Sequence, residues 1–312
     1  MKKKLIQFVN TFLTKTQLKM FAFVAVNIAV LIYVVHSRLN GSEPNEYILH
    51  FPTQNNPLNI SVSSDIDKNY FMIIGDWGAP DGESTYKGIQ QVIANKMLNY
   101  YKSQKEKGYN LLFIAAVGDN FYWTGQDCNE FYDHWSSIYG ELTTFPWLGV
   151  FGNHDWGNSD PWALCAWNNP KMTIDGIPYH SNQLNKDKDG CNPDNFYIPD
   201  FGYYYRIDEL NFELIAVDEN SSDCPGGLGG NGPNAGASEL FKNCGGSTSV
   251  GCGYLDKIRI ASENMMIQRA KESKNKNFII INHYPGIGAN LVDEFCKYRN
   301  SSDLPYEMIV AA

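Results

Sequence analysis

Short apolar runs recur along this chain, and four of them end next to a carboxylate, an amide or an imidazole. The longest comprises residues 111–117, and Gly118-Asp119 follows it directly. The other three cover residues 71–74, 147–151 and 278–281. Apolar runs of four to eight residues that are bounded by glycine or polar positions are typical of strands buried in a parallel sheet.

Helical patterns separate the first three runs. The first pattern follows Ser84 and ends near Gly108, and its apolar face is predicted to comprise Ile89, Val92, Ile93 and Met97. The second pattern, near residues 127–140, places three large side chains on one face: Phe131, Trp135 and Ile138. The order strand, helix, strand, helix, strand predicts an α/β fold with parallel neighbouring strands.

The second half of the chain is expected to add mixed structure. Residues 203–207 and 212–217 predict two antiparallel strands joined by a turn at Asp208-Glu209. Residues 257–274 have a helical composition, and residues 308–311 resemble the start of a further strand. The segment 156–200 is rich in Trp, Asn, Pro and Lys and predicts loops.

The polar side chains that follow the four runs are expected to meet, because the carboxyl ends of parallel strands lie at one edge of a sheet. They are Asp76, Asp119 with Tyr122, Asn153 with His154, and His283. Each of them alone is most simply a turn former or a packing residue. Their residue types together suit a transition metal, so their repetition in series predicts a metal centre.

Length and charge narrow the class of protein. With 312 residues, of which 43% are hydrophobic, the chain is long enough to bury a full α/β core. Its net charge of −9 leaves no basic face for a nucleic-acid backbone, so we expect no nucleic-acid partner.

The N-terminal part has a basic leader and an apolar segment. Residues 1–19 contain lysines and no acid, and residues 20–35 are apolar except for Asn27. This segment is shorter than the roughly 20 residues of a comfortable membrane span and longer than a usual signal-peptide core, so a cleaved signal and an uncleaved anchor both remain open. The basic leader favours a single-pass anchor with a cytosolic N-terminus.

The expected organisation follows from this leader. Residues 1–40 are the signal or anchor region, residues 41–69 a polar linker, and residues 70–312 the folded domain on the lumenal or extracellular side. Seven cysteines, none in a Cys-x-x-Cys pair, fit an oxidising compartment. Because their number is odd, one cysteine has no disulfide partner within this chain. Four glycosylation sequons also agree with secretion: Asn40, Asn59, Asn220 and Asn300.

Four motifs in this order resemble the calcineurin-like metallophosphoesterases. They are Gly-Asp-x-Gly from residue 75, Gly-Asp-Asn-Phe-Tyr from residue 118, Gly-Asn-His-Asp from residue 152 and Asn-His-Tyr-Pro from residue 282. Within that family the chain is most similar to the purple acid phosphatases of the small, tartrate-resistant type, for which Tyr122 is the marker. The resemblance covers residue 70 to the end and implies a four-layer α/β/β/α fold.

The resemblance also implies a site. Asp119 would bridge two metals, Asp76 and Tyr122 would bind Fe(III), and Asn153 and His283 would bind a divalent Fe, Zn or Mn ion. His154 would not be a ligand but would stabilise or protonate the leaving group. The implied reaction is the hydrolysis of phosphate monoesters at acidic pH, by water activated between the two metals.

The sequence departs from the family at several positions. The family adds one histidine to each metal from a Gly-His-x-His motif, which does not occur here. We therefore expect a truncated chain, and the alternative is a catalytically inactive, membrane-anchored scaffold. A phosphodiesterase or nuclease on the same fold is disfavoured by Tyr122 and by the acidic charge. Trp156 stands where close relatives carry a histidine, and Asn282 replaces a usual glycine.

Overall fold

The computed structural model describes residues 49, 58, 60–78, 84–122, 131–156, 173–174, 177–178, 183–184, 193–224, 248–300 and 305–312. All of them belong to one compact unit, Tyr47–Ala312. The leader, the apolar segment 20–35, the cysteines 128, 165, 191 and 244 and the side chain of Trp156 lie outside the described part. Within that part, no helix combines the length and the apolar character that crossing a bilayer requires.

Four parallel strands form the first sheet, in the order β1-β2-β3-β6. They are β1 (Asn69–Ile74), β2 (Asn110–Ala116), β3 (Trp147–Gly149) and β6 (Phe196–Tyr197). The central strand β2 is buried from Leu111 to Ala116, as expected for a strand covered on both faces. The predicted parallel order of the first three strands is confirmed, whereas β6 lies in a segment predicted as loops.

The second sheet is mixed, in the order β10-β9-β8-β7. Its strands are β7 (Tyr203–Ile207), β8 (Phe212–Ala216), β9 (Asn277–Ile281) and β10 (Glu307–Ala311). The predicted antiparallel pair β7 and β8 is confirmed, and the short helix η6 (Asp208–Leu210) joins them. Strands β8, β9 and β10 are parallel to one another. A separate two-stranded antiparallel pair consists of β4 (Thr173–Ile174) and β5 (Ile177–Pro178).

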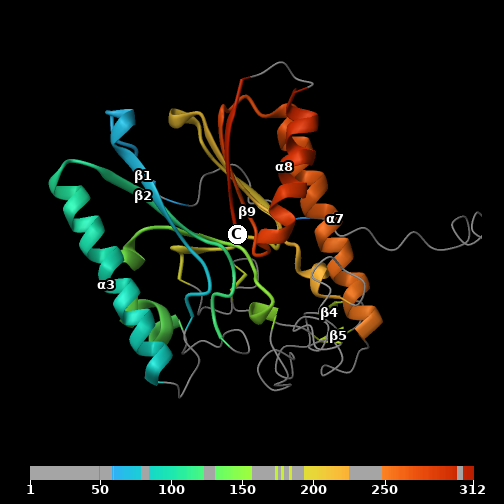
Figure 1. Ribbon diagram of the computed structural model, residues 1–312, viewed down its shortest axis with the longest axis horizontal. Coiled ribbons are helices and arrows are strands. Elements are labelled where there is room, and N and C mark those ends of the chain that lie inside the picture. The colour runs from blue at the N-terminus through green and yellow to red at the C-terminus, as the bar shows by residue number, and fades with distance from the viewer. Residues whose placement is uncertain are drawn as a thin grey trace, which may run out of the picture. The chain divides into compact units, whose positions relative to one another are not determined.

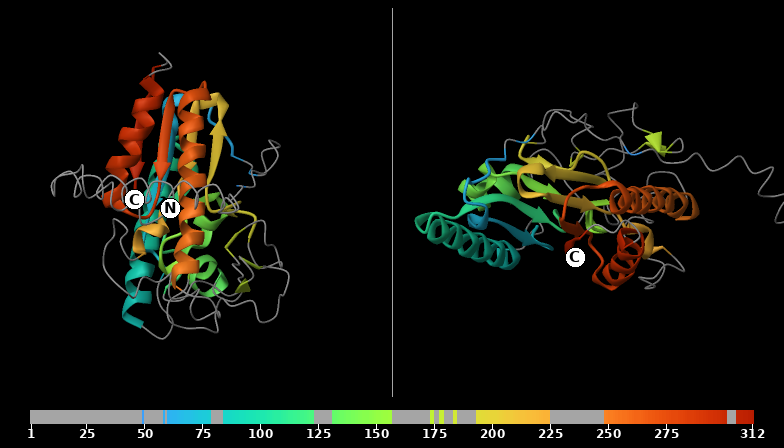
Figure 2. Two further views of the ribbon diagram at one scale, coloured as in Figure 1. Left: turned by 90° about the vertical axis from the view of Figure 1, so that its right-hand side faces the viewer. Right: turned by 90° about the horizontal axis from the view of Figure 1, so that it is seen from above.

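Helices cover the outer sides of the two sheets. Helix α3 (Ser84–Glu106) lies along the first sheet, whereas α7 (Thr248–Glu272) and α8 (Pro285–Asn300) lie along the second (Figures 1 and 2). The sheets share one core, in which Phe71 and Phe113 of the first sheet contact Phe212 of the second at centroid distances of 5.9 and 5.8 Å. The layers agree with the order helix, sheet, sheet, helix that the resemblance implies.

Helix α3 begins where the sequence predicts, but it is rotated from the predicted orientation. Ile89 and Val92 are each 53% exposed, while Gln90, Ala94 and Tyr101 are buried. The reason is polar: Gln90 Nε2 donates a hydrogen bond to the backbone oxygen of His134 at 2.7 Å. The hydrogen bond of the buried Gln90 amide and the close packing of Ala94 therefore decide which side of α3 faces the sheet. The predicted apolar side does not decide it.

Shorter helices link the strands of the first sheet. η1 (Ile66–Lys68) precedes β1, and the segment after β2 contains the π-helix η2 (Phe131–Ser136), α4 (Ser137–Tyr139) and η3 (Gly140–Thr144). The expected inward face of this segment is confirmed, since all three predicted side chains are buried: Phe131, Trp135 and Ile138. Helix α8 was not predicted from the sequence, although Pro285 at its first turn is a common start signal.

The segment predicted as a linker takes part in the core at its end. Leu58 is buried, and Ile60 and Val62 pack against the same core. The side chain of Asn110 donates to the backbone oxygen of Ser61 at 2.8 Å. These contacts attach the chain to the folded unit before β1 begins.

The structure corrects the interpretation of Asn220 as a glycosylation site, because this asparagine is fully buried. Its Nδ2 atom, which would carry a glycan, donates to the backbone oxygen of Phe151 at 3.1 Å and to Asp218 Oδ2 at 3.0 Å. Asn220 is therefore not accessible in the fold. Asn300 is exposed at the end of α8, and the remaining two sequons lie outside the described residues.

A buried polar network fixes α7 against the second sheet. Glu213 of β8 has no exposed surface. It accepts a bidentate pair of hydrogen bonds from Arg269, whose Nε and one terminal nitrogen lie 2.5 and 3.1 Å from the carboxylate oxygens. Ser273 Oγ and Asn275 Nδ2 donate to the same carboxylate at 2.5 and 3.2 Å. These donors orient α7 against the sheet, and the guanidinium of Arg269 neutralises the buried charge of Glu213.

Replacing Arg269 with methionine is expected to lower the free energy of unfolding by about 3 kcal/mol, because it leaves the Glu213 charge buried without its guanidinium. Arg206→Met is the matched control, because its partner Asp208, 3.5 Å away, has a side chain that is 66% exposed, and such pairs contribute about 1 kcal/mol or less. Urea unfolding of both variants measures the difference. Equal losses would show that the Glu213 network does not hold α7 in place.

Candidate metal centre

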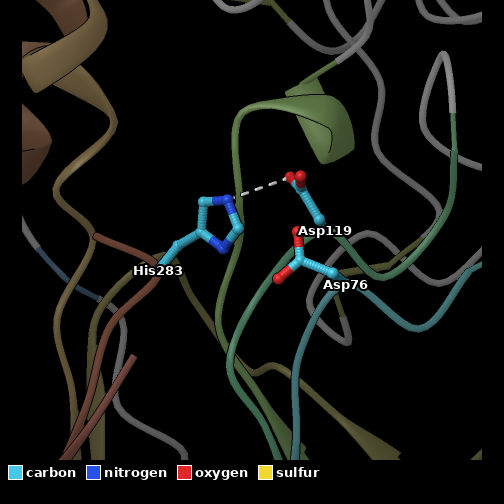
Figure 3. Close-up of side chains that lie close together, drawn as sticks. All are labelled: Asp76, Asp119 and His283. Carbon is cyan, nitrogen blue, oxygen red and sulfur yellow. Dashed lines mark ion pairs between the residues drawn. The ribbon is translucent and has the colours of Figure 1, made fainter. Parts of the chain in front are cut away.

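Three side chains from the ends of three strands meet at one point. Asp76 follows β1, Asp119 follows β2 and His283 follows β9, so both sheets contribute. Their ligand atoms all lie within 4.8 Å of one another, and Figure 3 shows the two carboxylates beside the imidazole. His283 Nε2 lies 3.3 Å from Asp119 Oδ1. Oxygen and nitrogen donors converging in this way fit a metal ion of the hard to borderline type.

Tyr122 joins the same cluster through its hydroxyl group. The hydroxyl oxygen lies 2.6 Å from Asp76 Oδ1 and 2.8 Å from Asp119 Oδ2, so its single proton is shared between the two carboxylates. Burial and the hydrogen bond to Asp76, together with the charge of Asp119, raise the pKa of this phenol well above its usual range. The phenol therefore keeps its proton between the two carboxylates until a cation replaces it.

Both aspartates adopt a backbone conformation that is uncommon for residues with a side chain. The φ angles of Asp76 and Asp119 are 50° and 48°, in the left-handed region that is sparsely populated outside glycine and costs roughly 1–3 kcal/mol. Aspartate tolerates this region better than most residues. Backbone bonds hold the turns in place, as Asp76 N donates to the oxygen of Gly118 at 3.1 Å. Such strain at two strand ends is typical of a functional site.

Two glycines let the loops approach Asp119 and His283. A Cβ atom on Gly152 would lie 2.2 Å from Asp119 Oδ1, and one on Gly118 would lie 2.7 Å from His283 Nδ1. Gly118 also has a φ of +93°. Only glycine fits either position without moving the side chains of the cluster.

The orientation of His283 is fixed by its other ring nitrogen. Nδ1 lies 3.1 Å from the carbonyl oxygen of Val117, which can only accept a hydrogen bond, so Nδ1 carries a proton and Nε2 faces Asp119. The side chain of Asn282, the residue before His283, accepts a hydrogen bond from Tyr284 N at 2.8 Å. This local turn holds the backbone on both sides of His283.

Asp119 and His283 form a charged pair. Burial alone would lower the pKa of His283, but the hydrogen bond and charge of Asp119 outweigh it and raise that pKa to about 9. Burial would raise the pKa of Asp119, but the hydrogen bond and charge of His283 lower it overall. The protonated imidazole of His283 thus supplies a positive charge to the cluster.

The third predicted loop contributes His154 and Asn153. The ring of His154 lies 4.6 Å from the ring of Tyr122, centroid to centroid, and its backbone N donates to Asp119 Oδ1 at 3.0 Å. Asn153 directly follows Gly152, which abuts Asp119, so it lies on the same loop and is half-buried. The short helix η4 (His154–Trp156) begins there. The structure thus places Asp76, Tyr122, His154 and His283 around Asp119, while Asn153 lies on the adjoining loop.

Asp155 has a structural role that the sequence analysis did not predict. This fully buried carboxylate accepts from Asn120 N at 2.9 Å, Phe121 N at 3.1 Å and Gly152 N at 2.7 Å. The side chains of Asn120 and Gln183 donate to it as well. Burial and the charge of Asp119 raise its pKa to about 7, while these donors lower it. Asp155 therefore ties the loop carrying Asp119 to the loop carrying His154.

Residues 70–310 match the sequence model of the family described as calcineurin-like phosphoesterase. A search of curated proteins found no match. The matched region contains every residue of the cluster described above.

Replacing Gly152 with alanine is expected to weaken Zn²⁺ binding at least tenfold and to lower the free energy of unfolding by about 1–3 kcal/mol, because the new methyl group would overlap Asp119. Gly88→Ala in α3 is the control, since its methyl group meets nothing within 4 Å. The control should gain about 0.5–1 kcal/mol through helix propensity and leave metal binding unchanged. Titration calorimetry and urea unfolding check both variants, and unaltered Zn²⁺ affinity in Gly152→Ala would contradict the geometry.

Metal uptake at pH 7 is expected to release protons. His283 is protonated below its pKa of about 9, and a metal ligand must be neutral, so about one proton leaves this residue for each ion bound. Zn²⁺ titrations in buffers of different ionisation enthalpy count the protons released. His283→Ala should reduce the count by about one, and an unchanged count would show that His283 does not face the metal.

Proposed function

Because the chain belongs to the calcineurin-like phosphoesterase family, we propose that it is an acid phosphatase of the purple type, which hydrolyses phosphate monoesters at a two-metal centre. The observation that carries this proposal is the position of Tyr122. Its hydroxyl lies 2.6 and 2.8 Å from carboxylate oxygens of Asp76 and Asp119. A phenolate at this position suits a trivalent iron, and it is the feature in which this chain is most similar to that type of phosphatase.

Asp119 is suited to bridge two ions. Its Oδ2 faces Tyr122, and its Oδ1 faces His283 Nε2 at 3.3 Å. We assign Asp76 and Tyr122 to Fe(III), and His283 with Asn153 to a divalent Fe, Zn or Mn ion. When bound, such ions supply positive charge for a phosphate group and lower the pKa of a coordinated water.

His154 is proposed to act on the leaving group. It is half-buried and packs beside Tyr122, on the loop that Asp155 holds against Asp119. An imidazole at this place can donate a hydrogen bond to the oxygen that leaves the phosphate, which is a general-acid role. The acidic net charge of −9 favours a small phosphomonoester over a nucleic acid.

The proposed compartment is lumenal or extracellular, with residues 20–35 acting as a membrane anchor or as a cleaved signal. A disulfide between Cys224 and Cys252, with a sulfur distance of 2.08 Å, supports an oxidising environment. Cys296 is a free thiol among the described cysteines. The distribution of lysines before residue 20 favours the anchored form.

The proposal predicts turnover of a nitrophenyl phosphomonoester, with little turnover of the matching diester, by the full chain loaded with iron and zinc. Activity should be higher at pH 5 than at pH 8. Tyr122→Phe should abolish the visible absorption band of an iron-bound phenolate and lower kcat at least tenfold. Tyr132→Phe, which alters an exposed tyrosine, serves as the control.

Three outcomes separate the alternatives. A preference for the diester would favour a phosphodiesterase. Metal binding without turnover of either ester would favour the non-catalytic scaffold. An unchanged absorption band in Tyr122→Phe would contradict the assignment of Tyr122 to iron.

A further inference from the structure

Asn220 is the first residue of the short helix η7 (Asn220–Asp223), which follows β8, and it has no exposed surface. Three hydrogen bonds use its whole side chain. Nδ2 donates to the backbone oxygen of Phe151 at 3.1 Å and to Asp218 Oδ2 at 3.0 Å, while Oδ1 accepts from the hydroxyl of Tyr284 at 3.0 Å. A buried amide whose donors and acceptor are all paired is held in one orientation.

Two of these partners belong to loops that carry candidate metal ligands. Phe151 lies on the loop after β3, shortly before Asn153. Tyr284 directly follows His283 after β9, and the two rings lie 5.2 Å apart, centroid to centroid. Because β3 belongs to the first sheet and β9 to the second, the side chain of Asn220 joins loops of two different sheets.

Asn220 is itself held in place by groups outside these two loops. Its backbone N donates to Asp218 Oδ1 at 3.0 Å, so Asp218 binds both the backbone and the side chain of Asn220. Asp218 is fully buried. Cys224, which follows η7, forms a disulfide with Cys252 of α7. The amide of Asn220 is therefore a fixed point against which both loops are placed.

The loop after β3 is bound at two successive residues. Gly152 N donates to Asp155 Oδ2 at 2.7 Å, and Asp155 also accepts from Asn120 N, on the loop after β2. The carbonyl oxygen of Phe151, one residue before Gly152, accepts from Asn220. Asp155 thus ties this loop to its neighbour in the first sheet, whereas Asn220 ties it to the second sheet, from which His283 comes.

We infer that Asn220 is a positioning residue of the metal centre, which sets the separation between the loop of Asn153 and the loop of His283. The inference rests on the proposed two-metal site, in which these two residues hold the divalent ion. An ion with ligands from two sheets needs both loops in place before it binds. Hydrogen bonds that orient metal ligands in this way change metal affinity by about 10- to 100-fold when they are removed.

A purely structural role for Asn220 makes a different prediction. A buried amide that only supports the fold would lower the free energy of unfolding when it is replaced, and it would leave the metal affinity of the folded molecules unchanged. The hydroxyl of Tyr284 separates the two roles. Tyr284 is half-buried, and removing its hydroxyl leaves the ring beside His283 while breaking the bond to Asn220.

The test measures Zn²⁺ affinity by titration calorimetry and unfolding by urea, both with the full chain. Tyr284→Phe should weaken Zn²⁺ binding about tenfold. Tyr205→Phe is the matched control, since it removes a buried hydroxyl that donates to the backbone oxygen of Leu58 at 3.4 Å, outside the loops of the metal centre. Its Zn²⁺ affinity should equal that of the unaltered chain. Unchanged affinity in Tyr284→Phe, or an equal loss in Tyr205→Phe, would overturn the inference.

Asn220→Ala tests the shared contact. It removes the bonds to both loops, so it should weaken Zn²⁺ binding at least as much as Tyr284→Phe does. Adding Tyr284→Phe to Asn220→Ala should cause little further loss, because the hydroxyl no longer has its amide partner. Losses that add in full would show that Tyr284 does not act through Asn220. If Asn220→Ala does not fold, Tyr284→Phe and its control still decide the question.

The same measurements separate this inference from the proposed phosphatase activity. Zn²⁺ affinity is measured without substrate, so a chain that turns over no ester can still show the loss in Tyr284→Phe. Hydrolysis of the monoester by the unaltered chain, with unchanged Zn²⁺ affinity in both variants, would overturn the role of Asn220 and leave the phosphatase proposal intact. No Zn²⁺ binding by the unaltered chain would overturn the metal centre and this inference together.

Discussion

The carboxylate of Asp119 is the group on which the arrangement of this site depends. One of its oxygens accepts from the backbone of His154 and faces His283, and the other accepts from Tyr122. It stands at the end of β2, which is buried from Leu111 to Ala116, and His283 follows a strand of the second sheet. The contact between them therefore requires the two sheets to meet at their carboxyl edges. A shift of either sheet would separate the pair.

Close backbone packing makes that contact possible. The loops before Asp119 and His154 approach so closely that a methyl group at Gly152 would overlap the carboxylate. Asp155 then holds these loops together through backbone and side-chain donors. The site thus combines strained strand ends with a buried carboxylate that supports them. Rigid placement of this kind is what a pair of metal ions needs, since their ligands must already converge before binding.

The sequence predicts the strands and the residues that follow them, because an apolar run and its terminating polar residue are local signals. Asp76, Asp119 and His283 were predicted in this way, and the structure brings them together. The rotation of α3 was not predictable, since it depends on a hydrogen bond from Gln90 to a distant backbone oxygen.

Anomalous X-ray diffraction from crystals grown with Zn²⁺ would show directly whether Asp119 and His283 hold a metal ion. We expect a zinc peak within about 2.5 Å of Asp119 and of His283 Nε2, as zinc–ligand distances require. The peak should be lost in Asp119→Asn. A strongest peak at any other place in the folded unit, or a peak that Asp119→Asn retains, would contradict the proposed metal centre.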